Sequence, residues 1–178
     1  SIWTKSYGGD GDEFGSDIIK IENNGYILLG STSSYGNSDL DILMIKIDDE
    51  GEEQWIRNYG IGSDDIGQAI VQTRDGGYMV QFLVEGYGHG NSAAGLMKLN
   101  SAGDVLWTNA FGGTVNTMSK MFSKINSNEY ISVCSQIDYS SNTSNTWMIK
   151  IDDEGEIIWE KIFGKHGKDD GFSAIPTV

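Results

Sequence analysis

The residues best suited to chemistry in this sequence are carboxylates that cluster in short stretches with glycine. Calcium prefers several oxygen ligands at about 2.3–2.6 Å, so the closely spaced pairs Asp10 with Asp12, and Asp39 with Asp41, are candidate metal ligands. No cluster follows the Asp-x-Asp-x-Asp-Gly loop that ends in glutamate. Aspartate and glycine are also the residues of tight turns, so the alternative is that these clusters only shape the backbone. No cofactor besides calcium is expected.

Histidine and cysteine offer little further chemistry. His89 and His166 are the only two histidines, and they lie in separate glycine-containing loops without the spacing of metal ligands. A catalytic triad would need a serine and an aspartate brought in from distant parts of the chain, and no pattern in the sequence indicates this. The single cysteine, Cys134, lies in an apolar run and is predicted to be a buried, inert thiol. We therefore expect no catalytic residues and no enzymatic activity.

The elements that must position these residues repeat along the chain. Tryptophans stand 52 residues apart, at Trp3, Trp55, Trp107 and Trp159. In each of the last three copies, a glycine in a polar turn stands four residues before the ring. A fixed period of about 50 residues is typical of repeat architectures such as propellers, so it decides the fold class.

Within one period, four short apolar runs separated by turn signals predict four β-strands. In the first period they are 17–21, 26–32, 41–47 and 53–59, and no run has the 3.6-residue period of a helix. A four-stranded sheet repeated at this interval predicts an all-β fold, a β-propeller of antiparallel blades. A β-solenoid is the alternative, although its coils are usually shorter. We place three blades and two lone strands in one domain, 1–178: blades 14–60, 66–112 and 118–164, and strands 2–8 and 172–178.

Three complete blades do not close a ring, because propellers have about four to eight. We expect either that the chain is part of a longer propeller or that copies associate through the lone terminal strands. Strand edges favour such association because their backbone N–H and C=O groups are unpaired.

Residues that recur at one position in every blade are predicted to hold neighbouring blades together. Each recurring tryptophan would pack its ring against the next blade. A lysine also recurs on the third strand of each blade, where apolar surroundings require an acidic partner. These lysines are Lys46, Lys98 and Lys150. The predicted partners precede each first strand: Asp12, Asp64 or Asp65, and Asp169 or Asp170.

The sequence resembles the β-propeller repeat of secreted and cell-surface bacterial proteins, and more distantly the repeat of quinoprotein propellers. The resemblance lies in Trp3, Tyr7-Gly8-Gly9, Asp12, Gly25-Tyr26, Gly30-Ser31-Thr32-Ser33-Ser34, Asp39, Asp41, Lys46-Ile47-Asp48, Gly51 and Trp55. It spans nearly the whole chain and is looser in the second and third periods. It implies a propeller with an extracellular or cell-surface location, and it implies no catalytic residues. In quinoproteins the similar motif docks neighbouring blades and does not bind the quinone.

The charge of the chain excludes several kinds of partner. The net charge is −14, from 26 acidic and 12 basic residues. Such a surface repels a phosphate backbone, so nucleic-acid binding is not expected. No apolar run approaches the roughly 18 residues of a membrane helix, so membrane insertion is not expected either.

The loops between second and third strands differ most between periods, and variable loops on a repeated framework are where binding specificity is housed. We predict a non-catalytic binding or scaffold module whose partner is a protein or a glycan. The candidate binding residues are Tyr35, Asn37, Tyr87, His89, Tyr139 and Asn142. Two alternatives stay open: a purely structural spacer, and a polysaccharide hydrolase or lyase with its site in the central channel, for which Asp17 and Lys120 are the candidates.

Overall fold

A computed structural model describes residues 3–22, 25–36, 39–86, 92–112, 116–164, 167–169 and 171. These residues form twelve strands in three four-stranded antiparallel sheets, so the all-β prediction is confirmed. The first sheet contains β1 (Glu13–Lys20), β2 (Tyr26–Thr32), β3 (Asp41–Ile47) and β4 (Glu53–Tyr59). The second contains β5 (Asp65–Gln72), β6 (Tyr78–Glu85), β7 (Ser92–Leu99) and β8 (Val105–Gly112). The third contains β9 (Asn116–Lys124), β10 (Glu129–Asp138), β11 (Thr143–Asp152) and β12 (Ile157–Phe163).

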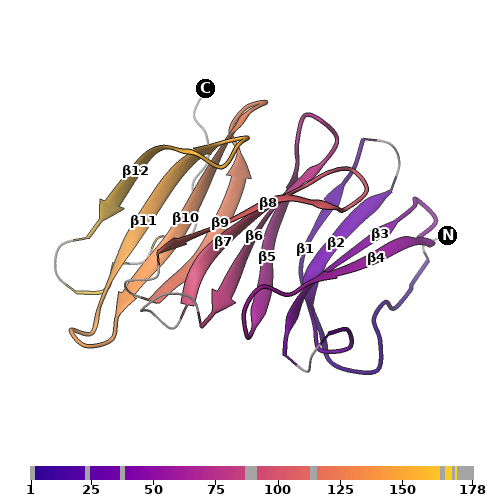
Figure 1. The fold of residues 1–178 in the computed structure, drawn as a ribbon, viewed down its shortest axis with the longest axis horizontal. Helices are drawn as coiled ribbons and strands as arrows, with labels where there is room; N and C mark the ends of the chain where they lie inside the picture. The colour runs from indigo at the N-terminus through magenta and orange to yellow at the C-terminus, as the bar shows by residue number, and fades with distance from the viewer. Residues whose placement is uncertain are drawn as a thin grey trace.

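The three sheets stand side by side in chain order, as Figure 1 shows. Each sheet is a meander in which consecutive strands pair. The first strand of each later sheet packs against the sheet before it, since β5 contacts β1, β2 and β3, and β9 contacts β5, β6 and β7. Among the described residues we find no helix of the length and apolarity needed to cross a membrane.

The middle strands of the second sheet are apolar on both faces because the first and third sheets cover them. All eight residues of β7 are buried, and so are seven of the eight in β6, where only Glu85 is exposed. The cluster between the first and second sheets includes Ile27, Met44 and Phe82, and the cluster between the second and third includes Leu96 and Trp147. Strands enclosed on both sides read as continuous apolar runs and do not alternate, which explains the sequence pattern.

One position in each sheet is filled by a large and a small residue on neighbouring strands. Directly opposed pairs join the second strand to the third in every sheet: Gly30 with Leu43, Phe82 with Gly95, and Cys134 with Trp147. A methyl group built on Gly95 would overlap the Phe82 ring, so the pair has room for only one large side chain. The repeat therefore keeps one large and one small side chain at this pair of positions but not the same residue types, as core packing requires.

The first strand of each sheet has a register shift at the same repeat position. The skipped residues are Ser16 in β1, Gln68 in β5 and Lys120 in β9. Next to the first shift, Asp17 accepts a hydrogen bond from the Ile70 N–H at 3.0 Å, which ties β1 to β5. The carboxylate proposed for a channel site therefore links two sheets.

Replacement of Gly67 by alanine should test how closely β5 approaches the first sheet. The added Cβ would lie 2.6 Å from the Gly30 carbonyl oxygen and 2.9 Å from Leu29 Cδ1. Because a backbone oxygen cannot move aside, we expect the free energy of unfolding to fall by about 2 kcal/mol in urea titrations. Gly15 is the matched control, since it stands at the same repeat position and its added Cβ would meet nothing within 4 Å. An equal cost at both positions would contradict the close approach of the sheets.

Strand limits agree with the prediction for β2, β3 and β4, whereas the first strand, predicted at 17–21, runs from Glu13 to Lys20. The lone strand predicted at 2–8 is absent from its described part, because residues 3–9 form no strand. Side chains hold this segment instead, through contacts to the turn after β3 that are described below. The lone strand predicted at 172–178 lies outside the described residues.

Candidate functional site

The most regular polar geometry in the described chain is the turn between the third and fourth strands of each sheet. In the first sheet, the Gly51 N–H donates to the Asp48 carbonyl at 3.1 Å. The Asp48 carboxylate accepts from the Glu50 and Glu52 N–H groups at 3.0 and 2.7 Å. Asn100 and Asp152 do the same in the other sheets. These clustered acids therefore close turns, as the alternative reading of the sequence proposes.

A tryptophan from the preceding segment lies against the glycine of each turn. These glycines have left-handed φ angles of 78° to 85°, and their Cα faces the ring. A methyl group built on Gly51 would lie 2.9 Å from the Trp3 ring, and one on Gly155 would lie 2.7 Å from Trp107 Cη2. On Gly103 it would lie 3.4 Å from Trp55 Cη2. We call these three contacts the docking row: the outer strand of one sheet packs on the glycine turn of the next sheet, and Trp3, which belongs to no strand, packs on the turn of the first sheet.

Polar groups complete each contact in the docking row. Tyr7 Oη donates to the Gly51 carbonyl at 2.8 Å, and Tyr59 Oη donates to the Gly103 carbonyl at 2.7 Å. In the third contact, Asn109 Nδ2 donates to the Gly155 carbonyl at 3.5 Å, because Phe111 replaces the tyrosine. Burial raises the pKa of Tyr59 far above its usual range, so its hydroxyl stays a donor at every physiological pH.

The last outer strand, β12, also carries the recurring tryptophan, Trp159, and an aromatic residue four positions later, Phe163. Among the described residues, no glycine turn lies against them. Lys161 Nζ lies 5.5 Å from the centre of the Trp159 ring. Phe163 is 48% exposed, whereas Tyr59 and Phe111 at the equivalent positions are partly buried. The four tryptophans therefore differ in setting: Trp55 and Trp107 are partly buried against a following turn, Trp3 is 41% exposed on one, and Trp159 is partly buried without one.

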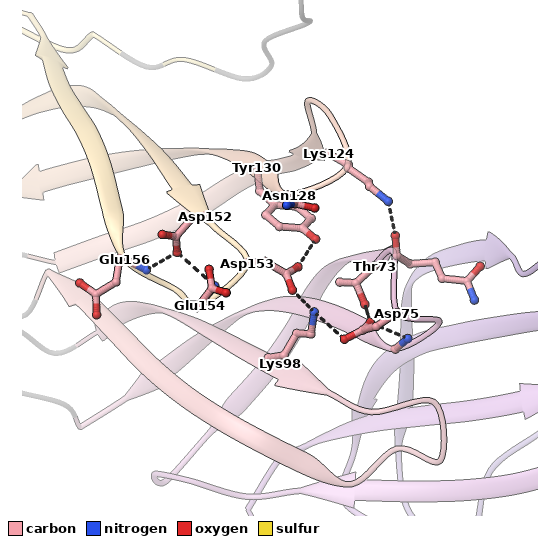
Figure 2. A network of polar contacts seen from close by, with 12 residues as sticks. Thr73, Asp75, Lys98, Lys124, Asn128, Tyr130, Asp152, Asp153, Glu154 and Glu156 are labelled. Atoms are coloured by element: carbon pink, nitrogen blue, oxygen red, sulfur yellow. Dashed lines mark hydrogen bonds and ion pairs between the residues drawn. The ribbon is translucent and has the colours of Figure 1, made fainter.

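A buried lysine forms a second link between the second and third sheets (Figure 2). Lys98 on β7 is 2% exposed, and its Nζ lies 2.7 Å from Asp153 in the β11–β12 turn and 3.3 Å from Asp75 in the β5–β6 turn. Tyr130 donates to the other oxygen of Asp153 at 2.6 Å. A hydrogen bond from Thr73 is the main cause of the lowered pKa of Asp75, which favours the charged form of that carboxylate opposite Lys98. We call these groups the Lys98 network.

The acidic partners predicted for the lysines are wrong for Lys98 and Lys150. Lys150 pairs with Glu129 of its own sheet at 2.9 Å, and no described carboxylate forms an ion pair with Lys46. The reason is topological: the lysines lie near the ends of the third strands, whereas the predicted acids precede the first strands at the opposite end of each sheet. One of these acids, Asp65, instead accepts the Ile61 and Gly62 N–H groups in the link between sheets.

The candidate binding residues separate into two described groups. Tyr35 is partly buried against Leu43 and Ile45 on the free face of the first sheet. Tyr139 and Asn142 come together on the β10–β11 loop, where they line a hollow of about 170 Å³ with Asp138 and Lys168. Asn37, Tyr87 and His89 lie outside the described residues.

The Asp138 carboxylate shapes the loop beside this hollow. It accepts from the Ser140 N–H and hydroxyl at 2.8 and 2.6 Å and from the Ser141 hydroxyl at 2.9 Å. These hydrogen bonds, those of the Ser140 side chain first, lower the pKa of Asp138 to about 2. Because the folded pKa lies below the unfolded value, the charged form supports the loop above about pH 4, and this support is lost as the pH falls toward 2.

Carboxyl carbon NMR titration should therefore give a midpoint near 2 for Asp138. In a Ser140→Ala variant the midpoint should rise, because the carboxylate loses a hydroxyl donor and keeps only the amide donor of that residue. Thr143→Ala is a suitable control, since Thr143 contacts Ser141 and not the carboxylate. A midpoint in the ordinary range for aspartate in the unchanged protein would show that the serines do not hold this carboxylate.

The candidate calcium ligands do not form a metal-binding group among the described residues. Asp10 and Asp12 are exposed before β1. Asp39 and Asp41 line a polar hollow of about 350 Å³ with Asn58, whose amide donates to Asp41 at 3.0 Å. Within the described ranges, no group of three or more histidine, cysteine, aspartate or glutamate residues is arranged to hold a metal ion.

Sequence reasoning missed two contributors to these contacts. The tyrosine hydroxyls of the docking row were not singled out, although an aromatic residue stands four positions after every recurring tryptophan and the period itself marks it. Asp153 was not singled out either, because its partners Lys98 and Tyr130 lie 55 and 23 residues away. Comparison of the chain with models of protein families and with curated proteins finds no match.

Proposed function

We propose that this chain is a non-catalytic β-propeller module of an extracellular bacterial protein, and that it presents its variable loops to a macromolecular partner. The propeller supplies a rigid frame, and the loops supply recognition. The location follows from the resemblance to secreted and cell-surface bacterial repeats.

The repeated sheet-to-sheet contact supports the propeller. Each sheet docks on the next through the same ring and the same glycine turn, and each later sheet lays its first strand against the sheet before it. A contact that recurs between successive four-stranded sheets standing side by side is what the propeller proposal requires of neighbouring blades.

The main support for a binding function is that the two ends of the sheets differ: one end carries repeated contacts between sheets, and the other carries loops of variable sequence. The glycine turns and the Lys98 network lie at one end, at the β1–β2, β3–β4 and equivalent turns. The β2–β3, β6–β7 and β10–β11 loops lie at the other end. Framework chemistry repeats at the first end, and sequence varies at the second, so a partner would approach the loop end.

The β10–β11 loop favours a glycan as that partner. Tyr139 is 70% exposed, and an exposed ring beside polar groups suits the apolar face and hydroxyls of a sugar. The hollow next to it is lined by Asn142, Thr143 and Lys168, which supply both donors and acceptors. A protein partner is the other outcome of the experiment below.

The test combines a glycan array with a reducing-end assay on the same polysaccharides. We expect binding without turnover, and at least about a tenfold loss of affinity in Tyr139→Ala, since stacking on one ring contributes roughly 1–3 kcal/mol in analogous contacts. Glu154→Ala, an exposed change at the opposite end, should bind as the unchanged protein does.

Release of reducing ends without an added cofactor would overturn the non-catalytic assignment. Glycan binding that Tyr139→Ala leaves intact would overturn the place of the site. If no glycan binds and a purified protein partner does, with the same loss in Tyr139→Ala, the loop function stands and the partner class changes.

A further inference from the structure

Strand β12 carries the tryptophan of a docking contact, and no described residue supplies the glycine turn on which this ring would pack. Its sequence Trp159-Glu160-Lys161-Ile162-Phe163-Gly164 matches Trp3-Thr4-Lys5-Ser6-Tyr7-Gly8 in the positions of tryptophan, lysine, aromatic residue and glycine. Ile162 is 57% exposed and Phe163 48%, so an apolar edge faces solvent. Exposed apolar strands of this kind mark interaction surfaces.

The three docking contacts within the chain define what fits this edge. In each, the tryptophan packs on a glycine turn, and a residue two or four positions later contacts that turn. In the first contact the residue two positions later is Lys5, whose Nζ lies 2.6 Å from Glu52. Lys161 stands at the same position in β12.

Charge selects one of the three turns as the acceptor. The turn of the first sheet reads Asp-Asp-Glu-Gly-Glu-Glu from Asp48 to Glu53, whereas that of the second sheet has a single acid, Asp104. The turn of the third sheet, Asp152–Glu156, is covered by β8 and holds Lys98 through Asp153. A lysine on an incoming strand is therefore best matched by Asp48–Glu53.

The present occupant of that turn belongs to no strand and is held by side chains: Trp3 Nε1 donates to the Asp49 carbonyl, Tyr7 Oη donates to the Gly51 carbonyl, and Lys5 pairs with Glu52. Gly103 and Gly155 are covered by β4 and β8, which belong to complete hydrogen-bonded ladders. Gly51 is covered by residues 3–7, which form no strand, and Trp3 is 41% exposed. A strand already ordered in its own sheet avoids the cost of ordering, although the second copy still loses translational and rotational freedom on binding.

We propose that β12 of one molecule docks on the Asp48–Glu53 turn of a second copy, in the place that residues 3–7 occupy within one chain. Trp159 covers Gly51 of the second copy, and Lys161 pairs with its Glu52. The contact is head to tail, so it either closes a ring or continues as a chain of molecules. Two copies would bring together six sheets, twice the three of one chain, within the range of about four to eight blades in propellers. This inference rests on the docking row and does not depend on the loop ligand.

Sedimentation equilibrium of charge-swap variants tests the proposal. The unchanged protein should associate at micromolar concentration. Lys161→Glu and Glu52→Lys should each weaken association by about tenfold or more, because each places like charges in the contact. An equimolar mixture of the two variants should associate again, since every junction between unlike molecules then joins an acidic to a basic side chain. Arg74→Glu makes the same charge change at an exposed site in the β5–β6 turn and should not weaken association.

Trp159→Ala provides a second test that does not depend on charge. It should weaken association by about thirtyfold, as truncation of a buried aromatic anchor does, while circular dichroism stays unchanged. A protein that remains monomeric throughout the micromolar range would overturn the proposal, as would association that neither β12 variant weakens. Loss of association in Tyr139→Ala would place the contact in the loops and would likewise overturn it.

Discussion

Replacement of Asp153 by alanine is expected to lower the free energy of unfolding by about 3 kcal/mol at neutral pH. Asp153 is the nearest partner of Lys98, at 2.7 Å, and the Lys98 side chain is 3% exposed. The substitution leaves the ammonium group with only Asp75, whose side chain is 53% exposed and 3.3 Å away. It also removes the acceptor of the buried Tyr130 hydroxyl. Buried charges and donors that lose a partner cannot regain it from water.

Urea unfolding followed by circular dichroism measures this loss. Glu154→Ala is the matched control, since Glu154 is the exposed neighbour in the same turn and should change stability by less than about 0.5 kcal/mol. A cost for Asp153→Ala no larger than that of the control would mean that the Lys98 network does not join the sheets. The double variant Lys98→Met with Asp153→Ala should be less destabilised than the sum of the single changes, because neither group stabilises the fold once its partner is removed.

Replacement of Trp107 by alanine is the second change with a large expected effect, a loss of about 3 kcal/mol. Its ring packs on Gly155 and against the cluster between the second and third sheets. The same substitution at Trp159 should cost less than about 1 kcal/mol in the monomer at low concentration, because no described residue of the chain receives that ring.

Comparison of the two variants separates the contribution of the ring within its own sheet from its contact with the next turn. The two tryptophans share one repeat position on equivalent outer strands, and within the described chain only Trp107 has a turn to pack on. Urea unfolding at submicromolar concentration, with tyrosine or circular dichroism signals, gives both values. Equal losses at Trp107 and Trp159 would contradict the docking row, because they would show that the ring acts within its own sheet.

The limits of the strands could be predicted from the sequence better than the bulges in the first strand of each sheet. Strand limits for β2, β3 and β4 follow from apolar runs bounded by turn residues, and such local signals survive in the fold. Bulges at Ser16, Gln68 and Lys120 were not predicted, because a register shift is a property of two paired strands and the apolar run of one strand does not show it.

The candidate site was predictable only where the repeat period marks it. Tryptophans 52 residues apart indicated a contact that recurs. In the structure each of the first three rings packs on the glycine turn of the following repeat. The partners of Lys98 were missed because Asp153 belongs to the next sheet and has no counterpart at residue 101, which is a serine. A contact that occurs once, between residues far apart in sequence, leaves no periodic trace.

The pairing of a large with a small residue on neighbouring strands also could not be predicted from the sequence. Trp147 interrupts the repeat in the sequence, yet it is 5% exposed and opposite Cys134. Its indole Nε1 donates to Glu160 at 3.0 Å. Only the strand register reveals that the small residue opposite it makes room for the ring, so packing is enough to explain this departure from the repeat.

A double-mutant cycle on Trp107 and Gly155 tests the docking of one sheet on the next most directly. Gly155→Ala alone carries the strain of an alanine at a φ of 85° and a clash with the Trp107 ring, whereas in the Trp107→Ala background only the strain and the contact with Asn109 remain. We expect Gly155→Ala to cost about 1–2 kcal/mol more when Trp107 is present, measured by urea unfolding. An identical cost in both backgrounds would show that the ring does not lie on this turn, and the docking row would then not exist.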